Sequence, residues 1–145
     1  MIKSLAPAAA TLGALAFAAG FSSIACGGER TEGSEAVVRV DLREWSVRAS
    51  KSPAAAGPDT LEVRNRGRLG HELVIIKTDK PPATLPAPGG FVDERTAGEV
   101  MGHMYDLRRG GQRTQTFDLS VGNYVLICNV VGHYQLGMRA ALEVR

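Results

Sequence analysis

The chain has 145 residues, of which 44% are hydrophobic and 22% are charged. This length and composition suit one compact domain with a hydrophobic core. The formal net charge is only +2, and the basic residues are scattered along the chain, which argues against a nucleic-acid partner. The sequence has no internal repeats, and we expect a monomer.

The N-terminal segment has the features of an export signal. Lys3 is the only charged residue before Glu29, and an apolar stretch rich in Ala and Leu lies between them. A positive start, an apolar stretch and small residues near its end are typical of a signal sequence. We assign residues 1–25 to a signal peptide or membrane anchor. The domain is therefore expected in the periplasm or on the outer face of the cytoplasmic membrane.

Three routes of N-terminal processing are open. Ser23-Ile24-Ala25-Cys26 resembles a bacterial lipobox, whose cysteine is lipidated, although a lipobox usually has Leu where this chain has Ser23. Small residues at Ser23 and Ala25 also suit an ordinary signal peptidase. The uncharged stretch is long enough for an uncleaved spanning helix, which needs about 20 residues. We favour lipidation at Cys26 as the membrane anchor, which leaves Cys128 without a disulfide partner.

The remainder of the chain has the pattern of a β-protein. Residues 26–35 are polar and typical of a solvated tether. Val38, Val40 and Leu42 then alternate with charged residues, which is the period-2 signature of a half-buried strand. Trp45 is expected in the core. Further short apolar or alternating runs lie at residues 61–63, 73–76, 115–119, 124–127 and 140–144. Several short strands with turn signals between them predict an all-β sandwich over residues 36–145.

One connection breaks the regular spacing of these strands. Residues 78–112 contain four of the prolines, Pro81, Pro82, Pro86 and Pro88, together with several glycines. So long a connection is uncommon and is usually functional or forms a small excursion of its own. Asp93 is placed to cap a short helix that reaches Glu99. We predict a long irregular excursion here.

Potential metal ligands gather near the C-terminus. Cys128, His133 and Met138 lie at the end of one expected strand, in the following loop and at the start of the next strand. Cys128 has the same parity as Tyr124 and Leu126, so its side chain is expected to face the interior. His71 stands much earlier, at the start of the apolar run 73–76 and after a glycine-containing turn.

The combined donor set favours copper. Two imidazoles, one thiolate and a weak thioether suit an ion that cycles between Cu(I) and Cu(II). Zinc usually takes carboxylates, water or more thiolates instead of Met. Nucleophilic catalysis by Cys128 lacks a recognisable orienting partner. A multicopper oxidase is also disfavoured, because Ile127 and Asn129 flank Cys128 and the chain has only 3 histidines. We therefore expect a protein that is not an enzyme.

The motif resembles that of the cupredoxins, the family of blue copper proteins. The resemblance covers residues 36–145 and depends on two segments, Gly70-His71-Glu72-Leu73 and Gly122-x-Tyr124-x-x-x-Cys128-x-x-x-x-His133-x-x-x-x-Met138. It implies a Greek-key sandwich of about eight strands with one type 1 copper ion at one end. The implied ligands are His71, Cys128, His133 and Met138.

The resemblance also implies roles for the groups around the copper ion. The backbone N–H of Glu72 would donate a hydrogen bond to the Cys128 thiolate, and His133 would form the solvent-facing edge through which electrons leave. The implied function is one-electron transfer between redox partners, such as a cytochrome or a membrane oxidoreductase.

A second candidate copper site supplies the alternative function. Met101, His103 and Met104 lie in one short segment, and two thioethers beside an imidazole can bind Cu(I). The alternative is therefore an exported protein that captures and delivers copper. The same residues also fit a loop whose Met side chains pack on the sandwich.

Overall fold

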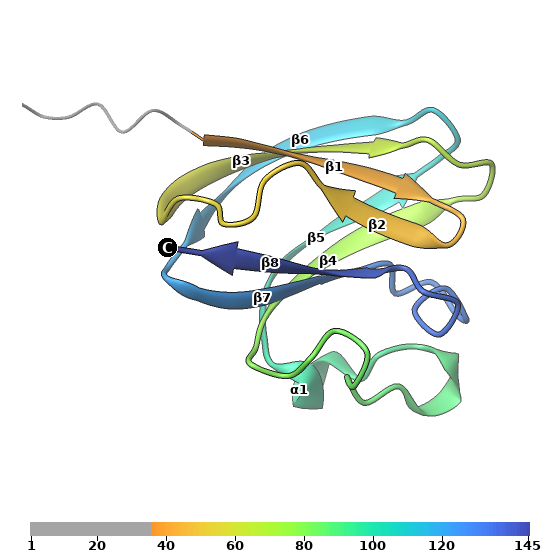
Figure 1. The fold of residues 1–145 in the computed structure, drawn as a ribbon. Helices are drawn as coiled ribbons and strands as arrows, with labels where there is room; N and C mark the ends of the chain where they lie inside the picture. The colour runs from red at the N-terminus through yellow and green to blue at the C-terminus, as the bar shows by residue number, and fades with distance from the viewer. Residues whose placement is uncertain (1–35) are drawn as a thin grey trace, which may run out of the picture. The chain divides into compact units, whose positions relative to one another are not determined.

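A computed structural model describes residues 36–145 (Figure 1). The predicted signal segment 1–25, the tether 26–35 and Cys26 lie outside the described residues. The described part contains eight strands, β1 (Ala36–Arg43), β2 (Ser46–Ala49), β3 (Gly57–Asn65), β4 (His71–Lys77), β5 (Glu99–Leu107), β6 (Gln112–Leu119), β7 (Gly122–Ile127) and β8 (Arg139–Val144).

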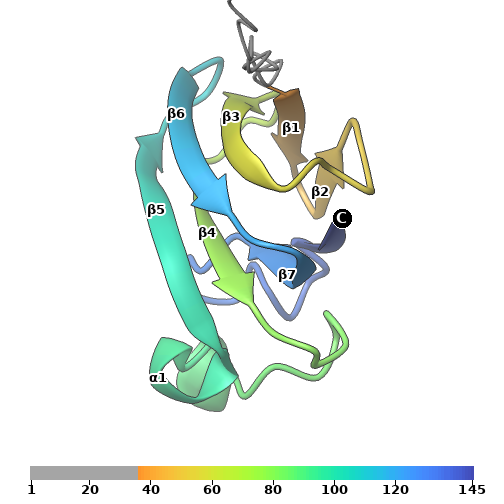
Figure 2. The same cartoon turned by 90° about the vertical axis from the view of Figure 1, so that its left-hand side faces the viewer.

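The strands form two sheets of four. The first sheet has the order β2-β1-β3-β6 and the second the order β5-β4-β7-β8. β1 and β3 pair in parallel, whereas the other neighbours pair in antiparallel fashion. The edge strands β5 and β6 run side by side along one margin, so the two sheets meet there (Figure 2). The prediction of an all-β sandwich with about eight strands is confirmed.

The main core lies between the two sheets. Val38, Val40 and Leu42 of β1 are fully buried, whereas Arg39 between them is exposed. Leu73 and Leu126 bury their side chains from the opposite sheet in the same cluster. The alternation of apolar and charged residues in the sequence therefore distinguishes buried from exposed positions, as expected for a sheet with one solvent-exposed face.

The second sheet is buried on both faces at its centre. Val74, Ile76, Val125 and Ile127 point away from the main core into a second apolar cluster. Segment 78–98 covers this outer face with Leu85, Val92 and Ala97, and it lies below the second sheet in Figure 1. Burial on both faces explains why β4 and β7 are continuous apolar runs and not alternating ones.

The irregular excursion is shorter than predicted, because β5 occupies residues that were assigned to it. Most β5 side chains are exposed or half-buried, and only Met104 and Leu107 are buried. The pairing of β5 with β4 also has two register shifts. An edge strand with shifted register loses the strict alternation that identifies a strand in a sequence, and for this reason β5 was missed.

The short helix was predicted in the right place. Helix α1 (Glu94–Ala97) has Asp93 as its N-cap, and the Asp93 side chain accepts a hydrogen bond from the Arg95 backbone N–H. The helix ends at Ala97, two residues before the predicted limit, because Gly98 and the start of β5 follow. Within residues 36–145, no helix is both long and apolar enough to cross a membrane.

Candidate metal centre

The four predicted ligands come from three neighbouring pieces of the second sheet. His71 is the first residue of β4, Cys128 follows β7 directly, and Met138 precedes β8. The loop that carries His133 is closed by backbone hydrogen bonds from Cys128 N–H to Met138 C=O and from Met138 N–H to His133 C=O, each 3.0 Å long. β4 lies between β5 and β7 in the sheet, so pairing with β7 brings His71 next to Cys128.

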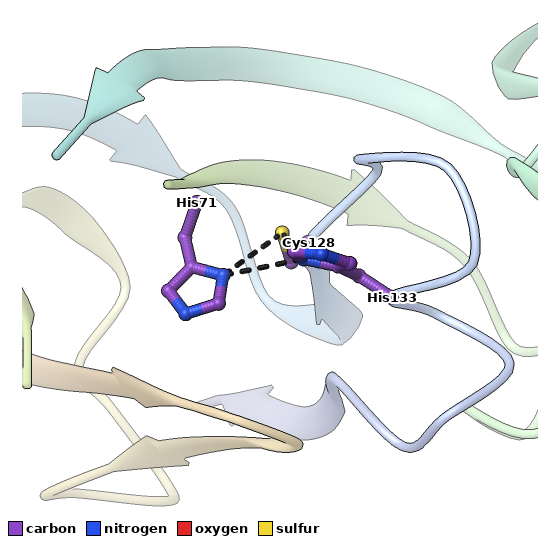
Figure 3. Close-up of side chains that lie close together, drawn as sticks. All are labelled: His71, Cys128 and His133. Carbon is purple, nitrogen blue, oxygen red and sulfur yellow. Dashed lines mark hydrogen bonds between the residues drawn. The ribbon is translucent and has the colours of Figure 1, made fainter. Parts of the chain in front are cut away.

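Three donor atoms converge at this end of the sandwich (Figure 3). The Nδ1 atoms of His71 and His133 lie 3.2 Å apart. Cys128 Sγ lies 3.8 Å from His71 Nδ1 and 3.4 Å from His133 Nδ1. The structure thus brings together three of the four predicted ligands through their donor atoms, although His71 is far from the other two in the sequence.

These distances fit a shared metal ion. Nitrogen and sulfur ligands bind a transition metal at roughly 2.0–2.3 Å, so three donors arranged around one ion lie about 3.5–4 Å from one another. The observed separations of 3.2, 3.8 and 3.4 Å are close to that range. Within residues 36–145, this is the one group of His, Cys, Asp or Glu side chains close enough to hold a metal ion.

The site is shielded from water. Cys128 and Met138 are fully buried, while His71 and His133 expose 2% and 7% of their surface. Met138 belongs to the same core cluster as Cys128, as their shared strand parity predicts. Its side chain is therefore buried in the core between the sheets, as is that of Cys128.

The sulfur of Cys128 accepts a hydrogen bond from a backbone N–H group of β4. The N–H of Glu72 donates to Cys128 Sγ across 3.5 Å, which is the contact expected from the sequence resemblance. Burial nevertheless raises the pKa of the Cys128 thiol, and the hydrogen bond from Glu72 only partly offsets this. The thiol is thus protonated in the metal-free protein at neutral pH, and a metal ion must displace its proton.

The two imidazoles are held in their neutral form. Burial lowers the pKa of His71, and the neighbouring His133 lowers it further, although Glu44 opposes both effects. Burial also lowers the pKa of His133. Neutral imidazole is the form that binds metals, so both rings are prepared for coordination at neutral pH.

Trp45 is not the core residue that was predicted. Its side chain is 40% exposed, and its ring meets the His133 ring edge-on, with 5.2 Å between centroids. Trp45 lies in the turn between β1 and β2, where the indole covers the ligand loop and not the sandwich interior. His133 therefore has little solvent exposure of its own, and Trp45 forms the outer surface beside it.

Segment 78–98 braces the ligand loop from the other side. Asn129, next to Cys128, accepts a hydrogen bond from Val92 N–H at 2.6 Å and donates to Glu94 at 2.8 Å. The Tyr134 hydroxyl, next to His133, donates to Pro82 C=O at 2.7 Å and accepts from Leu85 N–H at 2.9 Å. The residues that follow each of these two ligands are therefore tied to the excursion.

The three residues of the second predicted copper site lie in β5 and have different surroundings. Met104 is part of the core between the sheets, and Met101 packs against that core. His103 instead bonds to the Glu94 carboxylate at 2.8 Å and stacks on Tyr105. Both Met side chains therefore pack at the core between the sheets, whereas the His103 imidazole contacts Glu94 and Tyr105.

Glu44 is a site residue that was not found from the sequence. Its Oε1 atom lies 3.4 Å from His71 Nε2, but no motif or spacing in the sequence connects the two residues. Only the packing of the β1–β2 turn against the loop before β4 brings them together.

The chain is similar in fold to solved structures of auracyanins and rusticyanin. No family model and no curated protein matches its sequence. Auracyanin from Roseiflexus castenholzii superposes with a TM-score of 0.59 at 22% identity, over 77% of this chain and 98% of that chain. Auracyanin A from Chloroflexus aurantiacus, described as a "blue" copper protein, gives 0.53 at 20% identity, over 75% and 99%. A structure of rusticyanin variants gives 0.52 at 20% identity, over 75% and 76%.

These superpositions define the class of the fold. Eight strands in two sheets, with the candidate ligands at one end, form the cupredoxin β-sandwich.

The metal-free domain should lose stability as the pH falls below 6.5. The unfolded chain binds protons at both histidines near their ordinary pKa of 6.5, whereas the folded state resists protonation because both pKa values are lowered. The free energy of unfolding therefore decreases as the pH drops. Urea denaturation between pH 7.5 and 5.5 measures this effect. Glu44, which lies beside His71, keeps its charge throughout this interval because its pKa is lowered to about 2.

His71→Gln is the matched variant for this test. It should show a smaller decrease over the same pH interval, because one of the two buried imidazoles is absent. A metal-free wild-type domain that is equally stable at pH 7.5 and 5.5 would contradict the prediction.

Proposed function

We propose that this protein is an exported type 1 copper protein that carries single electrons between redox partners. The observation that carries the proposal is the convergence of His71 Nδ1, His133 Nδ1 and Cys128 Sγ in a buried site. Two imidazoles with one thiolate and a nearby thioether are the donor set of blue-copper electron-transfer sites. The proteins with similar folds include one described as a "blue" copper protein.

Copper, when bound, supplies the one-electron chemistry. His71, Cys128, His133 and Met138 would hold it at one end of the sandwich, with the Met138 thioether as the weakest donor. Cys128 would give up its thiol proton on binding, and the Glu72 N–H would stabilise the resulting thiolate. The neutral imidazoles would bind without losing a proton.

The surroundings of the ligands favour rapid electron exchange. β7 is hydrogen-bonded to β4 on one side and to β8 on the other, and segment 78–98 braces Asn129 and Tyr134 beside two of the ligands. Ligands on rigid, cross-linked segments keep nearly the same positions in both oxidation states. Little reorganisation would then oppose the gain or loss of an electron.

The partner would approach the end of the sandwich where Trp45 lies. Trp45 contacts the His133 ring and is 40% exposed, so the indole offers a surface for contact next to a ligand. A redox protein, such as a cytochrome or a membrane oxidoreductase, would accept or donate the electron there.

The copper-delivery alternative lacks support, because Met101 and Met104 pack in or against the core and His103 bonds to Glu94.

We also propose export and lipid attachment, on the basis of the sequence. The signal-like segment 1–25 precedes Cys26, and the polar residues 26–35 would act as a flexible tether spanning on the order of 15 Å. Such a tether would keep the domain close to membrane-bound partners and raise their effective concentration. Cys26 would carry more than one acyl chain, since one chain gives only reversible attachment.

The copper-loaded, oxidised domain should be intensely blue or green. Charge transfer from the Cys128 thiolate to Cu(II) produces this colour, so an absorption spectrum measures it. Cys128→Ser should abolish the colour, whereas the surface control Val121→Ala should retain it, because Val121 is 64% exposed and outside the site. A colourless wild type that holds one copper ion per chain would overturn the type 1 assignment.

Substitution of Met138 should shift the reduction potential without loss of copper. Met138→Leu removes the weak thioether donor and should raise the potential, while Met138→Gln supplies a stronger donor and should lower it. Protein-film voltammetry of both variants measures the direction of the shift in reduction potential. If Met138→Leu changed neither the spectrum nor the potential, Met138 would not be a ligand.

Intact-mass analysis of the membrane fraction tests the anchor. A diacylated or triacylated N-terminus at Cys26 is expected. A soluble chain that begins at unmodified Cys26 would indicate ordinary secretion, and a chain that retains residues 1–25 would indicate a helical anchor. Cys26→Ser should release the domain from the membrane and leave the blue spectrum unchanged.

A further inference from the structure

The side chain of Glu44 reaches from the turn after β1 to the loop that leads into His71. Its Oε1 atom accepts hydrogen bonds from the backbone N–H groups of Arg68 and Leu69, at 2.6 and 2.7 Å. These two residues lie shortly before His71 at the start of β4. The carboxylate therefore organises the segment that presents the first candidate ligand.

The same oxygen faces the outer nitrogen of that ligand. His71 Nε2 lies 3.4 Å from Glu44 Oε1, and the His71 side chain is fully buried. Among the described residues, Nε2 has no other polar partner and forms no hydrogen bond of good geometry. The separation is slightly longer than an N–H···O hydrogen bond of about 2.7–3.2 Å, so a small rotation of either side chain would close it.

The loop leaves room for this carboxylate at Gly67. A Cβ atom on residue 67 would overlap the carboxyl group of Glu44. The N–H of Gly67 is bonded to the Asn65 side chain at 2.7 Å, and Asn65 also donates to Leu69 C=O at 2.7 Å. The turn from residue 65 to residue 70 is thus built around the carboxylate, with a glycine where a side chain would displace it.

We propose that Glu44 is the positioning residue of the copper site, and that it acts through His71. The carboxylate would accept the Nε2–H of His71 and so keep Nδ1 unprotonated and directed at Cys128 and His133. A carboxylate that holds the outer N–H of a ligating imidazole fixes the ring orientation and makes the ligand a better donor. This inference rests on the proposed copper function and adds a residue from outside the ligand motif.

The charge of Glu44 gives the site a second property. The Glu44 carboxylate accepts backbone hydrogen bonds from Arg68 and Leu69, and N–H donors of this kind favour the charged form of a carboxyl group. The carboxylate is therefore ionised at neutral pH. A negative charge beside a copper ligand favours the more positive state of the site, so Glu44 would stabilise Cu(II) relative to Cu(I) and lower the reduction potential.

Glu44→Gln separates this role from the support of the loop. Glutamine keeps a carbonyl oxygen for the N–H groups of Arg68 and Leu69 but removes the charge. We expect the blue colour to remain, the preference for Cu(II) to fall about tenfold, and the potential to rise by about 59 mV. Copper affinity, measured by competition with a chelator, should fall by about 10-fold or more.

Two further variants complete the design. Glu62→Gln also removes one carboxylate, but Glu62 is paired with Arg39 on the outer face of the first sheet, so its potential should stay within the error of the wild type. Gly67→Ala should raise the potential in the same direction as Glu44→Gln, because the added methyl group displaces the carboxylate.

The metal-free protein offers a readout that needs no copper. Nitrogen-15 NMR of the His71 ring should place its proton on Nε2 in the wild type, next to Glu44. A proton on Nδ1, or a blue Glu44→Gln variant with unchanged potential and affinity, would overturn the role of Glu44. A wild type that forms no blue site with copper would instead overturn the proposed function, so the two failures are distinguishable.

Discussion

The close approach of two buried imidazole nitrogens and one buried thiol is the constraint on which the rest of the structure depends. The three donor atoms lie 3.2 to 3.8 Å from one another, and all three residues are buried away from water. Burial of polar groups is unfavourable unless they find partners, and it acts here on all three by disfavouring their charged forms. The surrounding structure has to hold these groups together, and a bound metal ion would satisfy them at once.

Two segments outside the ligand motif meet this requirement from opposite sides. The turn that contains Glu44 and Trp45 closes the site through the loop before His71 and through the His133 ring. The proline-rich segment 78–98 covers the second sheet and bonds to Asn129 and Tyr134. The long connection therefore has a structural role that its irregular sequence does not suggest. It protects the outer face of β4 and β7 and fixes the loop between Cys128 and Met138.

The enclosure also bears on how electrons would pass. A ligand histidine with only 7% exposure offers little contact surface of its own. Trp45 adds an aromatic ring between that histidine and the solvent, and Glu44, one residue earlier, faces the other histidine. One short turn thus contacts both imidazoles. The proposed route of the electron would depend on Trp45, and the proposed effect on the reduction potential would depend on Glu44, the residue before it.

The sequence alone determined those features of the protein that depend on residues close together along the chain. Alternation in β1, the apolar runs of β4 and β7, the cap at Asp93 and the spacing from Cys128 to Met138 were all readable, because each follows from strand parity or from one short loop. β5 was missed, since an edge strand with shifted register has no clear period. The position of Trp45 and the contact between Glu44 and His71 were decided only by the tertiary structure. Those contacts join a turn after β1 to the start of β4 and to the loop after β7, and no local pattern encodes which distant segments pack together.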